Sequence, residues 1–335
     1  MADHLQNKIN VHQGLKRVSA APASALRQCL ADIYHPEARW CGSHPVNEQH
    51  GLDAIEAVWA GLKSAMPDME RRDAIVVAGP HEESDYVGAL GHYQATFTAD
   101  WLGIPATHGV VHLRYGELHI VRDGKLWQTY AMLDVLDLMR QAGVWPLQQS
   151  LGREGMWPGP VNSDGLRLSD YDGEQGAASV AVMQAMHKGL LDFDGVSLES
   201  MTHRQYWKDN FMWYGPSGIG TTRGIRGFEA NHQIPFLRAF PDRDMGGEYI
   251  CFGDGPYAAT GGWPAMALTH TGPGWLGLPP SGRAITLRVM DFYRIEDGLI
   301  AENWVPIDIL NALDQLGMDV FARLRHQRGE PRRSL

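Results

Sequence analysis

Two aspartates, Asp134 and Asp308, occupy the same place in the two halves of the sequence. Each follows an apolar stretch expected to be the last strand of its half, and each begins a short amphipathic helix. An aspartate in this position can act as a general acid/base if an apolar setting raises its pKa toward neutrality. It can also be a helix N-cap, because Asp is a favoured capping residue. The two roles are compatible, so both aspartates are candidate catalytic residues.

Histidines are the next candidates for proton transfer. His92 lies in a strand expected over residues 86–98, and a repeat of period 174 places His270 at position 96 of that strand. Alternation along the strand then puts both imidazoles on one face. If that face lines a pocket, each half has a catalytic imidazole near its aspartate. The alternative is a histidine held between sheet and helix without a catalytic role.

Aromatic side chains recur near these positions and are candidate walls of a substrate pocket. Trp304 and Tyr130 stand four residues before the aspartates, and His44 lies in a loop that could form a pocket mouth or be solvated. Trp101 and Trp275 belong to loops that could close over a ligand or only hold a long hairpin. The full set of candidate binding residues is Trp304, Tyr130, Trp213, Tyr214, Trp40, His44, Trp263, Trp275 and Trp101.

Two more charged positions are shared between the halves, Arg114 with Arg288 and Glu117 with Asp291. Alternation places the arginine and the acid of each half on opposite faces of one strand. One of them could therefore face a pocket while the other faces a domain interface. The pattern does not say which, and it favours a structural role.

His108, His112 and His119 suggest a zinc site, but the expected strand argues against it. Four residues of extended chain span about 13 Å, so His108 and His112 cannot share an ion unless the strand breaks. The sequence has no paired-cysteine motif, no nucleophile elbow and no glycine-rich phosphate loop. We therefore expect chemistry without a metal or a cofactor.

The composition narrows the class of protein. The chain has 335 residues and a net charge of −10, which argues against a nucleic-acid partner because phosphate binding needs a basic face. Its three cysteines share no short spacing, which favours reduced thiols in the cytoplasm. Neither a signal-peptide pattern nor a stretch of about 18 apolar residues is present. We expect a cytoplasmic protein with a small-molecule substrate and no membrane partner.

An internal repeat reveals the elements that must position these residues. A shift of 174 places residues 101–105 on residues 275–279, both Trp-Leu-Gly-x-Pro, and the same ungapped register holds from about residue 65 to 143. Two copies are too few for a solenoid, so each copy is expected to be a domain. We expect the two to pack as an intramolecular pseudo-dimer through their sheets, and a further homo-oligomer is compatible with this arrangement.

Within each copy the pattern predicts an α+β domain. Two helices come first, and the second ends at a Pro-Asp turn. Strands follow, and the Asp-Gly pairs at 123–124 and 297–298 predict tight hairpins. A curved antiparallel sheet covered by helices leaves a conical pocket. The expected boundaries are 15–145 for domain 1, 146–177 for an ordered linker, 178–325 for domain 2 and 326–335 for a basic tail.

Four segments of the second copy carry a family resemblance, and the first copy is more divergent. They are T-H-T-G at 269–272, G-L-P-P-S-G-R at 277–283, residues 291–308, and Q-L-G at 315–317. Together they resemble the SnoaL-like polyketide cyclase family. The resemblance implies two tandem cystatin-like (nuclear transport factor 2-like) cone domains. It also implies ring closure by aldol condensation without cofactor or metal. The family's general acid/base, an aspartate after the last strand, matches Asp308 and, through the repeat, Asp134.

The same fold hosts isomerases, dehydratases, hydrolases and non-catalytic binders, so the reaction is less defined than the fold. We predict a cofactor-independent enzyme that abstracts and returns a proton on a small apolar carbonyl compound. One alternative is a non-catalytic small-molecule-binding protein. Another is one active domain with the other as a scaffold. The closer family match favours the second copy as the active one, whereas the richer histidine set favours the first.

Overall fold

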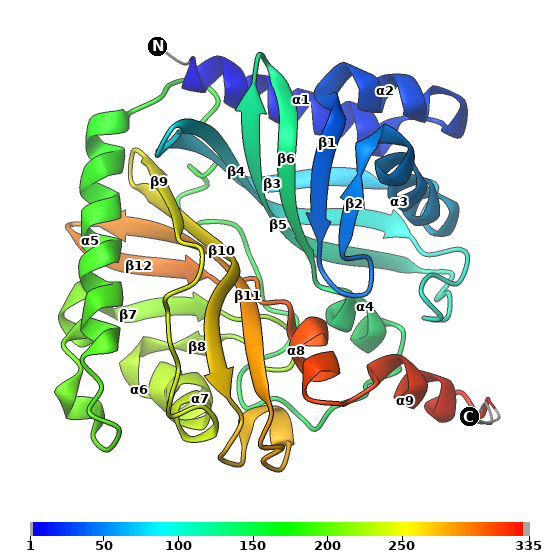
Figure 1. Cartoon of the computed structure of the whole chain (residues 1–335). Helices are drawn as coiled ribbons and strands as arrows, with labels where there is room; N and C mark the ends of the chain where they lie inside the picture. The colour runs from blue at the N-terminus through cyan, green and yellow to red at the C-terminus, as the bar shows by residue number, and fades with distance from the viewer. Residues whose placement is uncertain (1–2, 331–335) are drawn as a thin grey trace.

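The computed structural model describes residues 3–330, which form two α+β domains side by side (Figure 1). The predicted tandem pair is therefore confirmed, with one six-stranded sheet in each domain. A segment without helices or strands, residues 142–172, connects them. The expected basic tail is described only as far as residue 330, and its residues 331–335 lie outside the described part.

Domain 1 consists of helices α1 (His4–Ala20), α2 (Leu26–Ile33), α3 (Gly51–Ala65) and α4 (Val135–Gln141), and strands β1 (Tyr34–Gly42), β2 (Glu48–His50), β3 (Glu70–His81), β4 (Ser84–Thr96), β5 (Val110–Arg122) and β6 (Lys125–Leu133). Helix α1 begins before residue 15, where the sequence placed the start of the domain. Its buried face combines Val11, Leu15 and Val18 with Lys8, so its apolar pattern is weak.

Domain 2 consists of helices α5 (Gly173–Leu191), α6 (Gly224–Phe228), α7 (Ile234–Ala239), α8 (Ile309–Gln315) and α9 (Val320–Gln327), and strands β7 (Trp207–Tyr214), β8 (Thr222–Arg223), β9 (Ile250–Asp254), β10 (Tyr257–Thr269), β11 (Ala284–Glu296) and β12 (Leu299–Trp304). A π-helical turn, Glu229–Gln233, separates α6 from α7, whereas the sequence predicted one helix over residues 228–240. Such turns are frequent at functional sites.

Both sheets are mixed, whereas the sequence predicted antiparallel sheets. Strand β1 runs parallel to β6, and β7 runs parallel to β12, while the other neighbours are antiparallel. These parallel pairs join the first strand of each domain to its last. The turn signals in the sequence report only on strands that are close in the chain, so they could not reveal this pairing.

The predicted Asp-Gly hairpins are present between β5 and β6 and between β11 and β12. Asp123 and Gly124 have φ values of 51° and 72°, and Asp297 and Gly298 have values of 55° and 73°. Two successive positive φ values are the requirement of the tight turn that suits the twist of a hairpin.

The two domains pack through the outer faces of their sheets, as the pseudo-dimer prediction requires. Leu90 and Leu118 of domain 1 share one buried cluster with Phe252, Phe292 and Trp304 of domain 2. The buried side chains on the helix-facing sides of the sheets form a second cluster, which contains residues of both domains. Each sheet therefore has an interface face and an interior face, and side chains on alternate residues of a strand reach different environments.

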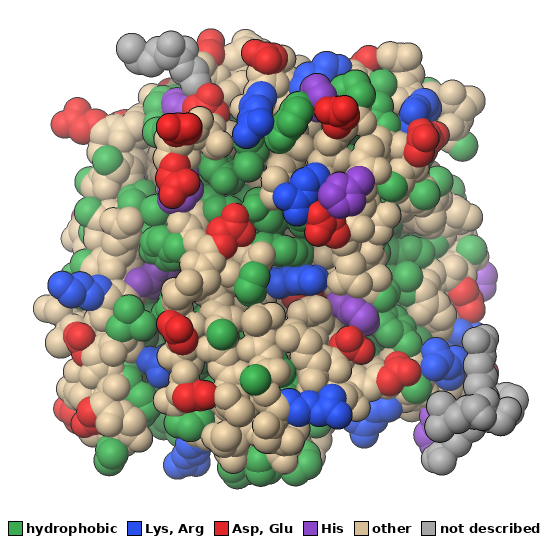
Figure 2. Space-filling model, in the orientation of Figure 1, with side chains coloured by type: hydrophobic (Ala, Val, Ile, Leu, Met, Phe, Trp, Pro, Cys, Tyr) green, Lys and Arg blue, Asp and Glu red, His purple; other side chains and the backbone are tan. Residues whose placement is uncertain are grey.

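The surface gives a further view of the molecule. Figure 2 shows acidic and basic side chains interspersed on one face. Across residues 3–330, every helix is too short or too polar to span a bilayer.

Candidate active site

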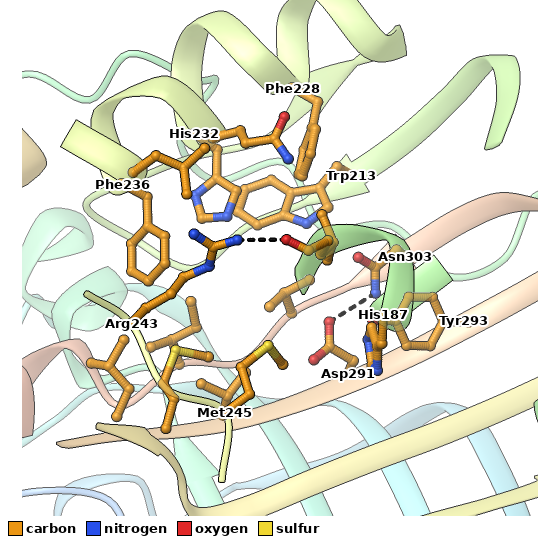
Figure 3. Close-up of a pocket in the computed structure, with 18 of the residues that line it drawn as sticks. His187, Trp213, Phe228, His232, Phe236, Arg243, Met245, Asp291, Tyr293 and Asn303 are labelled. Carbon is orange, nitrogen blue, oxygen red and sulfur yellow. Dashed lines mark hydrogen bonds between the residues drawn. The ribbon is translucent and has the colours of Figure 1, made fainter. Parts of the chain in front are cut away.

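A cavity lies in the interior of domain 2, between the sheet and the helices that cover it (Figure 3). The centre of a water molecule can occupy about 140 Å³ of it. Its apolar walls are formed by Leu190, Trp207, Trp213, Phe228, Phe236, Leu237, Met245, Met266, Leu287, Val289, Val305 and Ile307. Its polar lining consists of His187, His232, Gln233, Arg243, Asp291, Tyr293 and Asn303. Apolar walls with a few converging polar groups are typical of small-molecule sites.

Asp291 is the only carboxylate among these lining residues. It lies on β11, and alternation sends it into the interior while Arg288 faces the domain interface. Burial raises the pKa of Asp291 from 3.8 to about 6, and hydrogen bonds oppose this only in part. One of them comes from Nδ2 of Asn303, which donates to Oδ1 at 3.2 Å. A carboxyl with a pKa near 6 is available in both protonation states near neutral pH, as acid/base catalysis requires.

A chain of polar groups links the cavity to the protein surface. Nε2 of His187 on α5 lies 2.8 Å from the hydroxyl of Tyr293, and Nδ1 lies 2.9 Å from the hydroxyl of Tyr249. Burial lowers the pKa of His187 to about 4, so its ring is neutral. A neutral imidazole donates with one nitrogen and accepts with the other. Tyr249 is 37% exposed, so these three groups lead from the wall beside Asp291 to solvent.

An aromatic wall faces this polar side of the cavity. The ring of His232, in the π-helical turn, stacks on Trp213 with centroids 4.2 Å apart. Burial lowers the pKa of His232 to about 3, so it contributes a neutral aromatic surface. Phe228 and Phe236 lie within 6 Å of the same imidazole. The wall therefore suits the face of a planar or ring-shaped ligand.

Arg243 supplies the only cationic side chain among the lining residues that carries a permanent charge. It follows the Pro241-Asp242 turn and is partly buried. Its Nη2 donates to the carbonyl of Leu190 at 2.6 Å, and burial lowers its pKa. Figure 3 shows its guanidinium beside His232 and Phe236, whereas Asp291 lies on the side of Asn303 and His187.

The corresponding interior of domain 1 is filled by a buried ionic network. Glu117, which the repeat matches to Asp291, accepts from Nη2 of Arg71 at 2.7 Å. The same nitrogen lies 2.9 Å from Oδ1 of Asp73, and the guanidinium sits 4.3 Å from the ring centre of Tyr115. The pKa of Glu117 is lowered, because the charge of Arg71 and the neighbouring hydrogen bonds outweigh burial. The equivalent acids of the two domains thus have opposite pKa shifts, because Glu117 is paired with an arginine and Asp291 is not.

Asp308 lies at the domain interface and is not among the residues that line the cavity. It is the N-cap of α8 and accepts from the backbone N–H of Asn311 at 3.1 Å. It also accepts from the backbone N–H of His44 in domain 1 at 3.0 Å and from Nη1 of Arg288 at 3.1 Å. Burial raises its pKa despite these bonds.

Asp134 has the same set of partners in domain 1. It caps α4, accepts from Nη2 of Arg114 at 2.6 Å, and accepts from the backbone N–H of Ser217 in domain 2 at 3.1 Å. The capping alternative raised from the sequence therefore describes both aspartates. The shared contact with the opposite domain gives a structural reason for the repeat to keep them.

His92 and His270 lie on opposite faces of their sheets, so the prediction of a shared face was wrong. His92 is opposite Arg114 on the outer face, and its ring lies 6.0 Å from that of His112. His270 is buried beside Phe240, with Nδ1 3.2 Å from the hydroxyl of Ser281. Neither side chain lines the cavity.

The reason is a change of register that the ungapped repeat conceals. Thr96 pairs with Val110 in domain 1, whereas Thr269 pairs with Ala284 in domain 2, so β10 is offset from β4 by 173 residues while β11 is offset from β5 by 174. His270 consequently takes the place of Phe97, since their backbone N–H groups donate to the equivalent carbonyls of Arg283 and Gly109. A shift of one residue moves a side chain to the other face of a strand.

Of the nine predicted binding residues, only Trp213 lines the cavity. Trp304, Tyr130, Tyr214 and Trp263 belong to the cluster between the sheets or pack against it. Trp40, Trp101 and Trp275 are buried in the cores under the helices, and His44 belongs to the interface loop. Sequence reasoning missed His187, His232, Arg243 and Asn303. Within residues 3–330, no group of three His, Cys, Asp or Glu side chains is placed to hold a metal ion.

The match to a known protein family agrees with this architecture. The sequence profile of the SnoaL-like polyketide cyclase family matches residues 20–142 and 199–316. A search of curated proteins found no match. Similar solved structures include TsrD from Streptomyces laurentii (24% identity, 41% of this chain and 96% of that chain, TM-score 0.34). Another is a SnoaL-like protein from Jannaschia sp. CCS1 (20% identity, 42% of this chain and 92% of that chain, TM-score 0.34). A third is an NTF2-like protein from Burkholderia xenovorans LB400 (12% identity, 42% of this chain and 97% of that chain, TM-score 0.32). The family profile covers most of both domains, and the chain therefore belongs to the SnoaL-like polyketide cyclase family, as two tandem copies.

Proposed function

We propose that domain 2 carries the active site of an acid/base enzyme of the cyclase or isomerase type. Its substrate is a small, largely apolar carbonyl compound, and Asp291 is the catalytic base. The observation that carries the proposal is a partly buried carboxyl, with a pKa raised to about 6, in a cavity whose other walls are mostly apolar. Perturbed carboxyls in apolar clefts are a physical signature of catalytic sites.

The reaction begins with transfer of a proton from the carbon beside the substrate carbonyl to Asp291. The amide of Asn303 holds the carboxylate in place by its hydrogen bond to Oδ1. The neutral acid then returns the proton to the enolate, on the same or another atom. The sequence Tyr293–His187–Tyr249 provides a route by which the proton of Asp291 can exchange with solvent between turnovers.

Domain 1 acts as a scaffold in this proposal. Arg71 already neutralises Glu117 there, which keeps the carboxylate ionised and weakly basic. The aspartates of the interface, Asp134 and Asp308, are assigned to assembly of the two domains. This is the division of labour that the sequence left open, with the second copy active.

Exchange of carbon-bound hydrogen tests the proposal. 2-Tetralone serves as the probe, and loss of its α-protons in D₂O is followed by ¹H NMR with wild-type protein and Asp291→Asn. We expect wild-type protein to accelerate exchange above the buffer rate and Asp291→Asn to lower that acceleration about 10²- to 10⁴-fold, the usual contribution of a positioned base. The matched control is Asp314→Asn, an exposed aspartate on α8, which should keep the wild-type rate.

Equal exchange by wild-type protein and Asp291→Asn would contradict the proposal. Binding of the probe without any acceleration by wild-type protein would support a non-catalytic binding protein instead.

A further inference from the structure

Arg243 is partly buried and differs from the fully buried arginines in having no acidic partner. Arg71 pairs with Asp73 and Glu117, Arg114 with Asp134, and Arg294 with Glu302. Within residues 3–330, its one hydrogen bond goes to the carbonyl of Leu190, its guanidinium lies 5.5 Å from the ring centre of Phe193, and no carboxylate lies within 4 Å. A guanidinium has five N–H donors, so most of its hydrogen-bonding capacity remains free.

This lone charge is unfavourable in its present setting. Burial alone accounts for the lowered pKa of Arg243, and no nearby carboxylate opposes the shift. Charges removed from water are normally compensated by a counter-charge. A ligand anion would supply that counter-charge in the cavity itself. The planar fork of an arginine matches a carboxylate in particular, through two parallel hydrogen bonds.

The rest of the cavity determines what should be attached to the anion. Trp213, His232 and Phe236 offer neutral aromatic surface next to Arg243. Asp291 lies on the other side of the space, and neither charge affects the pKa of the other. A ligand can thus place an anionic group at Arg243 while its apolar ring fills the cavity. The edge of the ring opposite the anionic group then faces Asp291.

We propose that the cavity of domain 2 takes a small ring compound that bears a carboxylate, and that Arg243 binds this carboxylate. The proposal deepens the proposed function by naming the class of substrate. It rests on that function only for the role of Asp291, because anion binding does not depend on catalysis. Arg243 sets the orientation of the ligand, so that the carboxylate of the ligand points away from Asp291.

Calorimetric titration with a matched pair of probes tests this proposal. Benzoate and benzamide have nearly the same shape, and only benzoate carries a charge. We expect wild-type protein to bind benzoate at least about tenfold more tightly than benzamide, as hydrogen bonds to charged groups imply. Arg243→Met should abolish the preference. Arg243→Lys should keep part of it, because lysine retains the charge without the fork.

The matched control is Arg238→Met, an exposed arginine on α7, which should bind both probes as wild-type protein does. Circular dichroism and thermal melting verify that each variant is folded, and Arg243→Lys keeps the test valid if Arg243→Met is not. Equal binding of the two probes, wild-type benzoate affinity in Arg243→Met, or no binding of benzoate by wild-type protein would each overturn the proposal. A failure of the Asp291→Asn exchange test would leave this result unaffected, so the two proposals can fail separately.

Discussion

Replacing Asp291 by asparagine should stabilise the protein, and the gain should grow with pH. In the folded protein burial raises the pKa of this carboxyl to about 6, compared with 3.8 when it is freely solvated. Between these two values the folded state binds more protons than the unfolded state. The free energy of unfolding therefore falls as the pH rises through this interval. Asparagine cannot ionise, so the variant is spared this loss.

The structure sets the size of the effect. A difference of about two pKa units corresponds to about 3 kcal/mol, at 1.36 kcal/mol per unit. This is an upper value, because water in the cavity screens the carboxylate. The changed hydrogen bond to Asn303 contributes equally at every pH and cancels when two pH values are compared.

Urea denaturation at about pH 4.5 and about pH 7.5 measures the effect. We expect the stability of Asp291→Asn, relative to wild-type protein, to increase by up to about 2 kcal/mol from the lower pH to the higher one, because wild-type protein has already lost about 1 kcal/mol of the full difference at pH 4.5. The variant Asp314→Asn changes an exposed carboxyl and should show almost no such increase. A difference between Asp291→Asn and wild-type protein that is the same at both pH values would refute the reasoning, because it would mean that Asp291 titrates normally in the folded state.

Two further variants test the structural assignments. Asp308→Ala removes the cap of α8 and leaves Arg288 and the N–H of His44 without their acceptor, so urea denaturation should show a loss of about 2–4 kcal/mol; a loss below about 1 kcal/mol would contradict the interface role. Arg71→Met leaves Glu117 and Asp73 as uncompensated buried charges and should cost about 3–5 kcal/mol. The folded fraction of this variant should still exchange 2-tetralone at the wild-type rate, and a loss of exchange in folded protein would assign catalysis to domain 1.

Much of the fold could be predicted because its signals are local. The Asp-Gly turns and the Pro-Asp helix ends depend on residues close together in the chain, and the repeat indicates that the same elements occur twice. Alternation along one strand also predicted that Arg288 and Asp291 would face opposite ways. The pairing of β1 with β6 joins strands that are far apart in sequence, and no local signal reports it.

The candidate site could be predicted only in part, for two physical reasons. First, an aspartate that begins a helix after a strand looks the same whether it caps the helix or abstracts a proton, so the sequence favoured Asp308 as the base and gave Asp291 a structural role. Second, Arg243 stands out because no acidic side chain pairs with it, and the absence of such a partner can be recognised only in the folded structure. The different offset of β10 from β4 added a further error, because it places His270 on the opposite face from His92.

Because the two domains are parts of one chain, each domain can acquire amino-acid substitutions that the other does not. In a symmetric homodimer every substitution appears in both subunits, so a residue that closes one cavity closes the other. Here the two halves share the interface contacts of Asp134 and Asp308 but are encoded separately. One interior can therefore hold the ionic network of Arg71 while the other stays hollow around Asp291. A saturating ligand should accordingly bind with a stoichiometry of one per chain, half that of a dimer with two open cones.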